Sequence, residues 1–202
     1  MNIAEVVTAL EARFPILEKV EFRGETSLRA APDQIALLCQ ACKEELGFNF
    51  LLDISSVDHF GEEPRFEVVY ELYSLESGVH LRLKTKVSED HLEVPTVSHL
   101  WATADWHERE IYDMMGISFA NHPDLRRILM WDGYPFYPLR KDFPLEGKLS
   151  EVPDVAFSRA APLAGGPFVT VPTPGGTKDR EPRARRPEDS GSSEEAAGGS
   201  PG

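Results

Sequence analysis

Two cysteines, Cys39 and Cys42, form a C-x-x-C pair, a spacing found in thiol-disulfide catalysts and in metal sites. Catalytic pairs of the thioredoxin type lie at a helix N-terminus after a strand, where the helix dipole lowers the thiol pKa. Here Pro32 starts the expected helix, and both cysteines lie about two turns inside it, on the apolar face with Ile35 and Leu38. No second C-x-x-C or neighbouring histidine completes a zinc or iron-sulfur set. The pattern favours core packing, and a dithiol oxidoreductase is the alternative enzymatic interpretation.

Charged side chains are concentrated between residues 105 and 127. Those that could form one network are Glu108, Arg109, Glu110, Asp113, His122, Asp124, Arg126 and Arg127. In a helix over residues 105–115, Arg109 and Asp113 lie four residues apart and face each other. The spacing is compatible with a solvated face of weak ion pairs, each worth about 0.3–0.5 kcal/mol, and equally with a buried or interfacial network.

Other reaction chemistries lack support in the sequence. His107 and Glu108 do not begin an H-E-x-x-H zinc motif, because Ile111 stands four residues after His107. No nucleophile has a base beside it, and Asp53 and Asp58 are more typical of turn or cap residues than of an acid-base pair. The chain contains neither G-x-G-x-x-G nor a P-loop, so nucleotide or flavin binding is not indicated.

Apolar periodicity predicts the elements that position these residues. Helices are expected over 3–14, 32–46 and 105–115, and strands over 16–22, 27–30, 48–54, 66–73 and 79–86. Asn2 is expected to cap the first helix, while an Asp105 and Glu108 capping box and Gly116 delimit the third. A further short element is expected over 125–129, with Pro123 at its start. The order α-β-β-α-β-β-β-α indicates an α+β fold, with helices packed on a mixed, mostly antiparallel sheet.

Composition divides the chain into three parts. Residues 1–148 are expected to form one domain, 149–174 an extended partner-binding tail, and 175–202 a disordered low-complexity tail rich in Gly, Ser and Glu. The formal net charge of −13 argues against nucleic acid as a partner, because phosphate backbones require a basic face. The sequence shows no apolar run long enough to span a membrane and no signal peptide, so any membrane contact is expected to be indirect.

Three separated blocks resemble the C subunit, or 30 kDa subunit, of the proton-translocating NADH:quinone oxidoreductase, respiratory complex I. The blocks are residues 53–75, the run Glu108-Arg109-Glu110 with Asp113, Gly116 and residues 122–129 (H-P-D-L-R-R-I-L), and residues 138–144 (P-L-R-K-D-F-P). The resemblance covers about residues 30–146. One departure is Phe136-Tyr137, which stands where the family has Gly-His.

This resemblance implies a structural subunit of the peripheral arm, which supports electron transfer from NADH to quinone coupled to proton translocation. It implies that this chain holds no cofactor, and that FMN and the iron-sulfur clusters belong to partner subunits. Subunits D, B and I are the implied neighbours, on the cytoplasmic side of the bacterial inner membrane. A free-standing protein-interaction adaptor is a further alternative.

The charged residues are then expected to lie in an ionic network at or under the interface with those neighbours. Arg140, Lys141 and Asp142 are expected to extend it where the chain leaves the domain.

Overall fold

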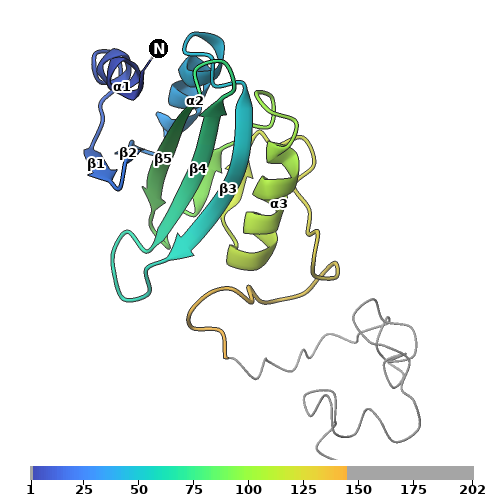
Figure 1. The fold of residues 1–202 in the computed structure, drawn as a ribbon. Helices are drawn as coiled ribbons and strands as arrows, with labels where there is room; N and C mark the ends of the chain where they lie inside the picture. Colours follow the sequence, from blue (N-terminus) through green and yellow to red (C-terminus); the bar gives the residue numbers. More distant parts are fainter. Residues whose placement is uncertain (1, 145–202) are drawn as a thin grey trace, which may run out of the picture. The chain divides into compact units, whose positions relative to one another are not determined.

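The computed structural model describes residues 2–144 of the 202-residue chain (Figure 1). Within them, the helices are α1 (Ile3–Glu11), α2 (Ile35–Glu44) and α3 (Ala104–Met115). The strands are β1 (Glu18–Phe22), β2 (Glu25–Arg29), β3 (Phe50–Asp58), β4 (Phe66–Ser74), β5 (Val79–Val87), β6 (Glu93–Pro95) and β7 (Ser118–Ala120). The expected segments 149–174 and 175–202 lie outside the described residues.

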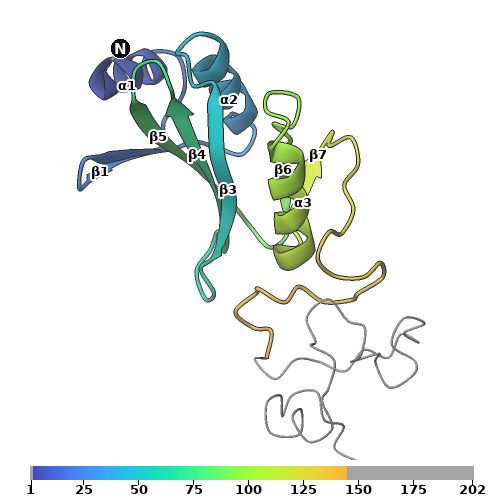
Figure 2. The same ribbon diagram turned by 45° about the vertical axis from the view of Figure 1, so that its right-hand side comes forward.

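Five strands form one sheet in the order β1-β2-β5-β4-β3. Its pairings are antiparallel except for the parallel pair β2 and β5. A second, parallel pair, β6 and β7, lies beside α3 (Figure 2). The predicted α+β class, with a mixed and mostly antiparallel sheet, is therefore confirmed.

Alternation along β4 and β5 explains the position of the core. Tyr70 is opposite Leu83 and Leu72 is opposite Leu81 across the two strands, so their side chains share one face. That face is fully buried and packs with apolar residues of α1, α2 and α3. The opposite face of β5 carries the basic residues that the alternation predicts, namely His80, Arg82, Lys84 and Lys86.

Several element boundaries differ from the predictions for local physical reasons. At the N-terminus, Asn2 and Glu5 form the predicted cap as a reciprocal capping box. The second helix begins only at Ile35, after a turn of three residues. Phe48 precedes β3, because its N–H closes the end of α2 by donating to the carbonyl of Cys42 at 3.0 Å. β6 and β7 were not predicted, since three residues are too few to show a period.

Candidate functional site

Helix α3 carries two carboxylates, Glu108 and Asp113, that are both fully buried. Ala104, Ile111 and Met115 of the same helix belong to the apolar core, so charged and apolar side chains share the buried side of the helix. Such carboxylates are stable only where donors or cations compensate for lost hydration. The compensation differs between the two positions.

The predicted capping box at the start of α3 is wrong. The helix begins at Ala104, and Thr103 before it makes no side-chain capping bond. The carboxylate of Glu108 points inward instead of back to the helix start. Its Oε1 accepts the Val97 N–H at 2.7 Å, and its Oε2 accepts from the Thr96 hydroxyl at 2.5 Å. Glu108 therefore joins α3 to the segment that follows β6.

Asp113 lies in a cage of donors supplied by one loop. Its Oδ2 accepts the backbone N–H groups of Ile128, Leu129 and Met130 at 3.0, 2.7 and 2.8 Å. Arg127 donates from Nη1 to Oδ1 at 2.5 Å and to the Asp113 carbonyl at 2.9 Å. Burial raises the pKa of Asp113, but these donors outweigh burial and hold the pKa below its ordinary value. Asp113 is therefore an ionised anchor for the loop.

This cage also explains why the expected short element over residues 125–129 is absent. In a helix, successive N–H groups donate to the carbonyls four residues earlier. Here three successive N–H groups converge on one carboxylate, and the segment forms neither helix nor strand. The side chain of Asp113 has replaced the local backbone acceptors.

Arg109 does not form the expected pair with Asp113. Its Nε and Nη2 donate to the carbonyls of Arg126 and Arg127 at 3.2 and 3.4 Å, and its guanidinium lies 5.3 Å from the ring centre of Trp106. The helical spacing does permit an ion pair, but Arg127 occupies that place beside Asp113. Arg109 consequently fixes the same loop through a second set of contacts.

Glu108 has weaker compensation than Asp113. His122 Nε2 lies 3.8 Å from its Oε2 and 3.1 Å from Asp105 Oδ1. The pKa of Glu108 is raised to about 7: burial is the largest cause and the nearby charge of Asp105 adds to it, while the hydrogen bonds from Thr96 and Val97 act in the opposite direction. Glu108 can therefore exchange a proton near neutral pH.

A third buried carboxylate, Asp58, lies at the end of β3. Arg65 binds it with two parallel hydrogen bonds of 2.9 Å, and the Lys141 N–H donates to Oδ2 at 2.8 Å. Arg65 also donates to Asp142. The hydrogen bond from Arg65 lowers the pKa of Asp58 in spite of burial. Lys141 and Asp142, which were predicted to extend the network where the chain leaves the domain, thus attach their segment to the end of β3.

Arg140 closes the end of α3. Its Nε donates to the carbonyl of Met115 at 2.7 Å, and its guanidinium lies 4.5 Å from the ring centre of Tyr137 and 5.1 Å from that of Phe66. Gly116 ends the helix as predicted, with φ of 78°. A Cβ atom at this glycine would lie 2.7 Å from both Arg140 Nη2 and the Tyr137 ring. The close packing of these two side chains against the end of α3 therefore requires a glycine at position 116.

The predicted charged residues thus do not form one network. Some of them lie around the buried carboxylates of Glu108, Asp113 and Asp58, and the others are at the surface. Glu110 is exposed, and Asp124 pairs with Arg126 at 2.8 Å where both side chains are more than half exposed. Exposed pairs of this kind contribute little to stability. Contact of any of these residues with a partner stays a prediction.

The interpretation of Asp53 and Asp58 as turn or cap residues is wrong, because both lie in strand β3 and Asp58 binds Arg65. Sequence reasoning also missed Arg65, Glu89 and Thr96. The sequence did contain a signal for the Asp58 and Arg65 pair. The two residues have opposite charges and flank the turn between two expected strands in the block of residues 53–75, so they could be expected to lie close together. Glu89 accepts from Arg65 at 3.1 Å, but it stands after β5. The contact of Thr96 with α3 depends on the tertiary path, and no local pattern indicates it.

The two cysteines lie inside α2 with no exposed surface. Burial raises the pKa of the Cys39 thiol well above its ordinary value and that of Cys42 to about 12. A dithiol catalyst requires an accessible thiolate. The geometry therefore argues against the dithiol interpretation.

Two further features are absent from the described part of the chain. Among residues 2–144, no three His, Cys, Asp or Glu side chains are grouped so that they could hold a metal ion. No helix in this range is long and apolar enough to cross a membrane.

The fold and these contacts define a small α+β domain in which buried carboxylates attach loops to a helix and a sheet edge. The family model described as "Respiratory-chain NADH dehydrogenase, 30 Kd subunit" matches residues 28–149. The chain belongs to this family, and the resemblance found in the sequence is confirmed.

Relatives and solved structures agree with this assignment. The NADH-quinone oxidoreductase C subunit of Geotalea uraniireducens is 51% identical over 132 residues, which cover 65% of this chain and 80% of the relative. The C subunit of Geobacter sulfurreducens is 49% identical over 133 residues, covering 65% and 82%.

Among structures, a trypsin-resistant fragment of Nqo5 superposes with a TM-score of 0.54 at 34% identity, covering 62% of this chain and all of the fragment. A chain of the membrane-bound sulfane sulfur reductase, an archaeal respiratory membrane complex, gives 0.61 at 28% identity and covers 70% and 85%.

Proposed function

We propose that this chain is the C subunit of an NADH-quinone oxidoreductase, in which it performs no redox step and supports the neighbouring subunits. Identity of about 50% over four fifths of the length of the C-subunit relatives carries the proposal. The geometry agrees with it, because the buried carboxylates of Asp113 and Asp58 bind backbone N–H groups and arginines of this chain. Both act as anchors for loops.

The electron carriers then belong to other subunits of the complex. FMN and iron-sulfur centres of the partners pass electrons from NADH to quinone, and the complex couples this transfer to proton translocation. The two cysteines of this chain do not take part, because their buried thiols are held in the protonated form.

Subunits D, B and I are the proposed neighbours, and the interface is proposed to involve the loop anchored on Asp113 and the segment anchored on Asp58. Both segments are held by buried hydrogen bonds and also present apolar side chains to solvent. Leu129 in the first segment and Leu139 in the second are each more than half exposed. Preorganised loops of this kind bind with a smaller loss of conformational entropy. We place this chain on the cytoplasmic side of the bacterial inner membrane, where it contacts the membrane only through its partners.

Co-purification tests this proposal. The full chain carries an affinity tag, the membranes are solubilised gently, and the proteins recovered with the tag are quantified by mass spectrometry. We expect the peripheral-arm subunits in equal proportion to this chain. Recovery of the chain alone from the membranes would contradict the proposal, and a stable pool away from the membranes would favour the adaptor alternative.

A dithiol oxidoreductase predicts a different result. Its cysteines would react with a thiol reagent in the native chain within the time of an ordinary labelling experiment. We expect Cys39 and Cys42 to react only when the chain unfolds, with the unfolded chain as the positive control.

A further inference from the structure

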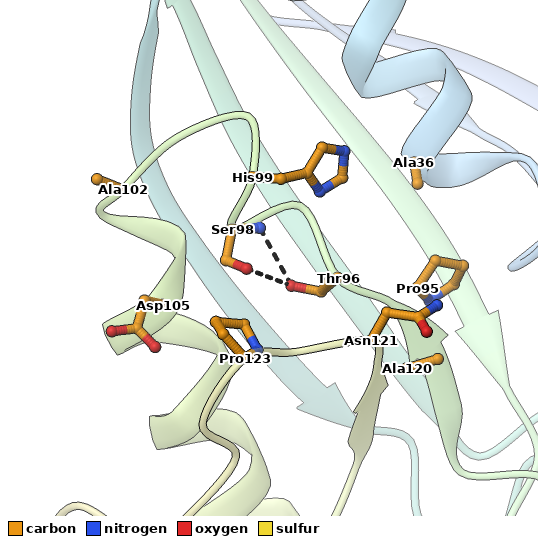
Figure 3. A pocket seen from close by; sticks show the side chains of 10 residues that line it. All are labelled: Ala36, Pro95, Thr96, Ser98, His99, Ala102, Asp105, Ala120, Asn121 and Pro123. Atoms are coloured by element: carbon orange, nitrogen blue, oxygen red, sulfur yellow. Dashed lines mark hydrogen bonds between the residues drawn. The ribbon is translucent and has the colours of Figure 1, made fainter.

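A line of hydrogen-bonding groups runs from the buried Glu108 to an open hollow on the surface. The Thr96 hydroxyl lies 2.5 Å from Glu108 Oε2 and 2.9 Å from the Ser98 hydroxyl. Thr96 and Ser98 both line the hollow, which has a volume of about 710 Å³ (Figure 3). Glu108 itself has no exposed surface. The two hydroxyls are thus the connection between the carboxyl group and the hollow.

Thr96 has one hydroxyl hydrogen and two neighbours that could accept it. Its oxygen already accepts the Ser98 N–H at 3.1 Å, as Figure 3 shows. A hydroxyl group offers one donor and two acceptor positions. The Thr96 hydrogen can therefore point to Glu108 or to the Ser98 hydroxyl, but not to both.

The charge on Glu108 decides between these two arrangements. An ionised carboxylate only accepts, so the Thr96 hydrogen points to Glu108, and the Ser98 hydroxyl donates to Thr96. A protonated carboxyl donates from Oε2 to Thr96, so the Thr96 hydrogen turns to Ser98. The hydrogen of Ser98 is then free to point into the hollow. One proton enters from water and binds the carboxylate, while the two hydroxyl hydrogens rotate without breaking any O–H bond.

We propose that Glu108, Thr96 and Ser98 form a proton-controlled hydrogen-bond switch, in which the charge of the buried carboxyl sets whether Ser98 offers a donor or an acceptor to the hollow. The switch is a property of this chain alone and does not rest on the proposed function. Its consequence is that a group contacting Ser98 meets a different surface when Glu108 is protonated.

The groups around Glu108 allow both states near neutral pH. Burial and, to a smaller extent, the charge of Asp105 of α3 raise the pKa of Glu108, which lies at about 7 once the hydrogen bonds from Thr96 and Val97 have lowered it. Cys39 of α2 and Tyr70 of β4 also face it, and the pKa of each is raised by burial, so both are neutral. His122 completes the surroundings, with Nε2 at 3.8 Å.

One hydrogen bond from the backbone orients the ring of His122. Its Nδ1 accepts the N–H of Asp124 at 3.1 Å, so the ring hydrogen lies on Nε2, on the side of Asp105 and Glu108. We assign the proton that controls the switch to the carboxyl group of Glu108, because its Oε2 is in direct contact with the Thr96 hydroxyl.

Amide NMR shifts of the ¹⁵N-labelled full chain, followed from about pH 5 to pH 9, test the switch. The Val97 N–H donates to Glu108 and reports its charge, while the Ser98 N–H donates to Thr96 and reports the rotation. We expect both shifts to follow one titration with a common midpoint. In Glu108→Gln both shifts should be constant, with Ser98 at the low-pH limit of the natural chain, because the amide also donates to Thr96.

Two variants of Thr96 separate the switch from simple titration of Glu108. Thr96→Val should keep the titration of the Val97 shift and lose that of Ser98, whereas Thr96→Ser should keep both. Glu110→Gln removes an exposed carboxyl of the same helix and should change neither. Constant shifts in the natural chain, titration that survives Glu108→Gln, or a Ser98 titration that survives Thr96→Val would overturn the proposal.

Discussion

Glu108 and Asp113 are five positions apart on one helix and are equally buried, yet their surroundings shift the pKa values of the two carboxyl groups in opposite directions. Burial raises the pKa of Glu108 to about 7. The same effect at Asp113 is outweighed, and its pKa lies below the ordinary value. Depth in the protein therefore does not determine the charge of a carboxyl group by itself.

The donors make the difference. Asp113 accepts from three backbone N–H groups and an arginine, whereas Glu108 accepts from one backbone N–H and one hydroxyl, with Asp105 close by. Donors fixed in the backbone stabilise the charged form without having to reorient. A loop that closes on a carboxylate thus keeps it ionised, and a site that lacks such a loop leaves it able to bind a proton.

Removing the charge of Asp113 should have the largest effect. Asp113→Asn keeps the shape but leaves Arg127 without its carboxylate and places an amide among N–H donors. Loss of one partner of a buried pair costs about 3–5 kcal/mol. Urea unfolding of the full chain measures this loss, and Glu110→Gln, at an exposed position, serves as the control. Equal unfolding free energies for the two variants would show that the cage contributes no stability.

The second prediction concerns the pH dependence that Glu108 causes. Its folded-state pKa of about 7 lies above the ordinary 4.5, so the folded chain binds the proton more tightly than the unfolded chain. This difference stabilises the folded chain fully at pH values below the ordinary pKa. The stabilisation is lost as the pH rises through 7, and the free energy of unfolding decreases by roughly 3 kcal/mol in total. Unfolding free energies measured across this range should fall in the natural chain and change less in Glu108→Gln. A parallel decrease in both chains would assign the effect to another group.

Gly116→Ala should loosen the aromatic support of the Asp113 cage. Tyr137 lies against both Arg127 and Arg140, and the new methyl group would collide with the ring and with Arg140. The positive φ adds a backbone cost, for a total of about 2 kcal/mol or more. Gly133→Ala is a matched control, because its φ is 84° but no atom lies within 4 Å. Thermal unfolding should rank Gly116→Ala as the less stable, and the reverse order would exclude the collision.

The smallest effect is expected at Asp58. This carboxylate differs from Asp113 because its main hydrogen-bond donor is a side chain, that of Arg65. Arg65→Lys keeps the charge but loses the two parallel hydrogen bonds, at a cost of about 1–2 kcal/mol. Because the pKa of Asp58 is lowered in the folded chain, its ionised form stabilises the fold at pH values above the ordinary pKa of an aspartate. This stability is lost as the pH falls through the lowered pKa. Because the variant raises that pKa, its acid unfolding should begin at a higher pH. Unchanged acid unfolding would mean that the Lys141 N–H alone holds Asp58 ionised.

The fold was largely predictable because its signals are local. The alternation in β4 and β5, the cap at Asn2 and the glycine at the end of α3 depend on neighbours in the sequence. The partners of the buried carboxylates were not predictable in the same way. Spacing paired Asp113 with Arg109, but its actual partner is Arg127, and Glu108 binds Thr96 across the core. Which of several donors reaches a carboxylate depends on the path of the loops between them.

The amount and turnover of the assembled NADH-quinone oxidoreductase in membranes of cells that carry Asp113→Asn test the structural role most directly. Native gels measure the assembled complex, and NADH oxidation with a quinone acceptor, divided by that amount, measures turnover. The control is Asp90→Asn, which changes an exposed carboxylate outside the predicted network. We predict less assembled complex with Asp113→Asn than with this control, and normal turnover in what does assemble. A normal amount of complex with reduced turnover would contradict the structural role and would implicate this chain in the chemistry.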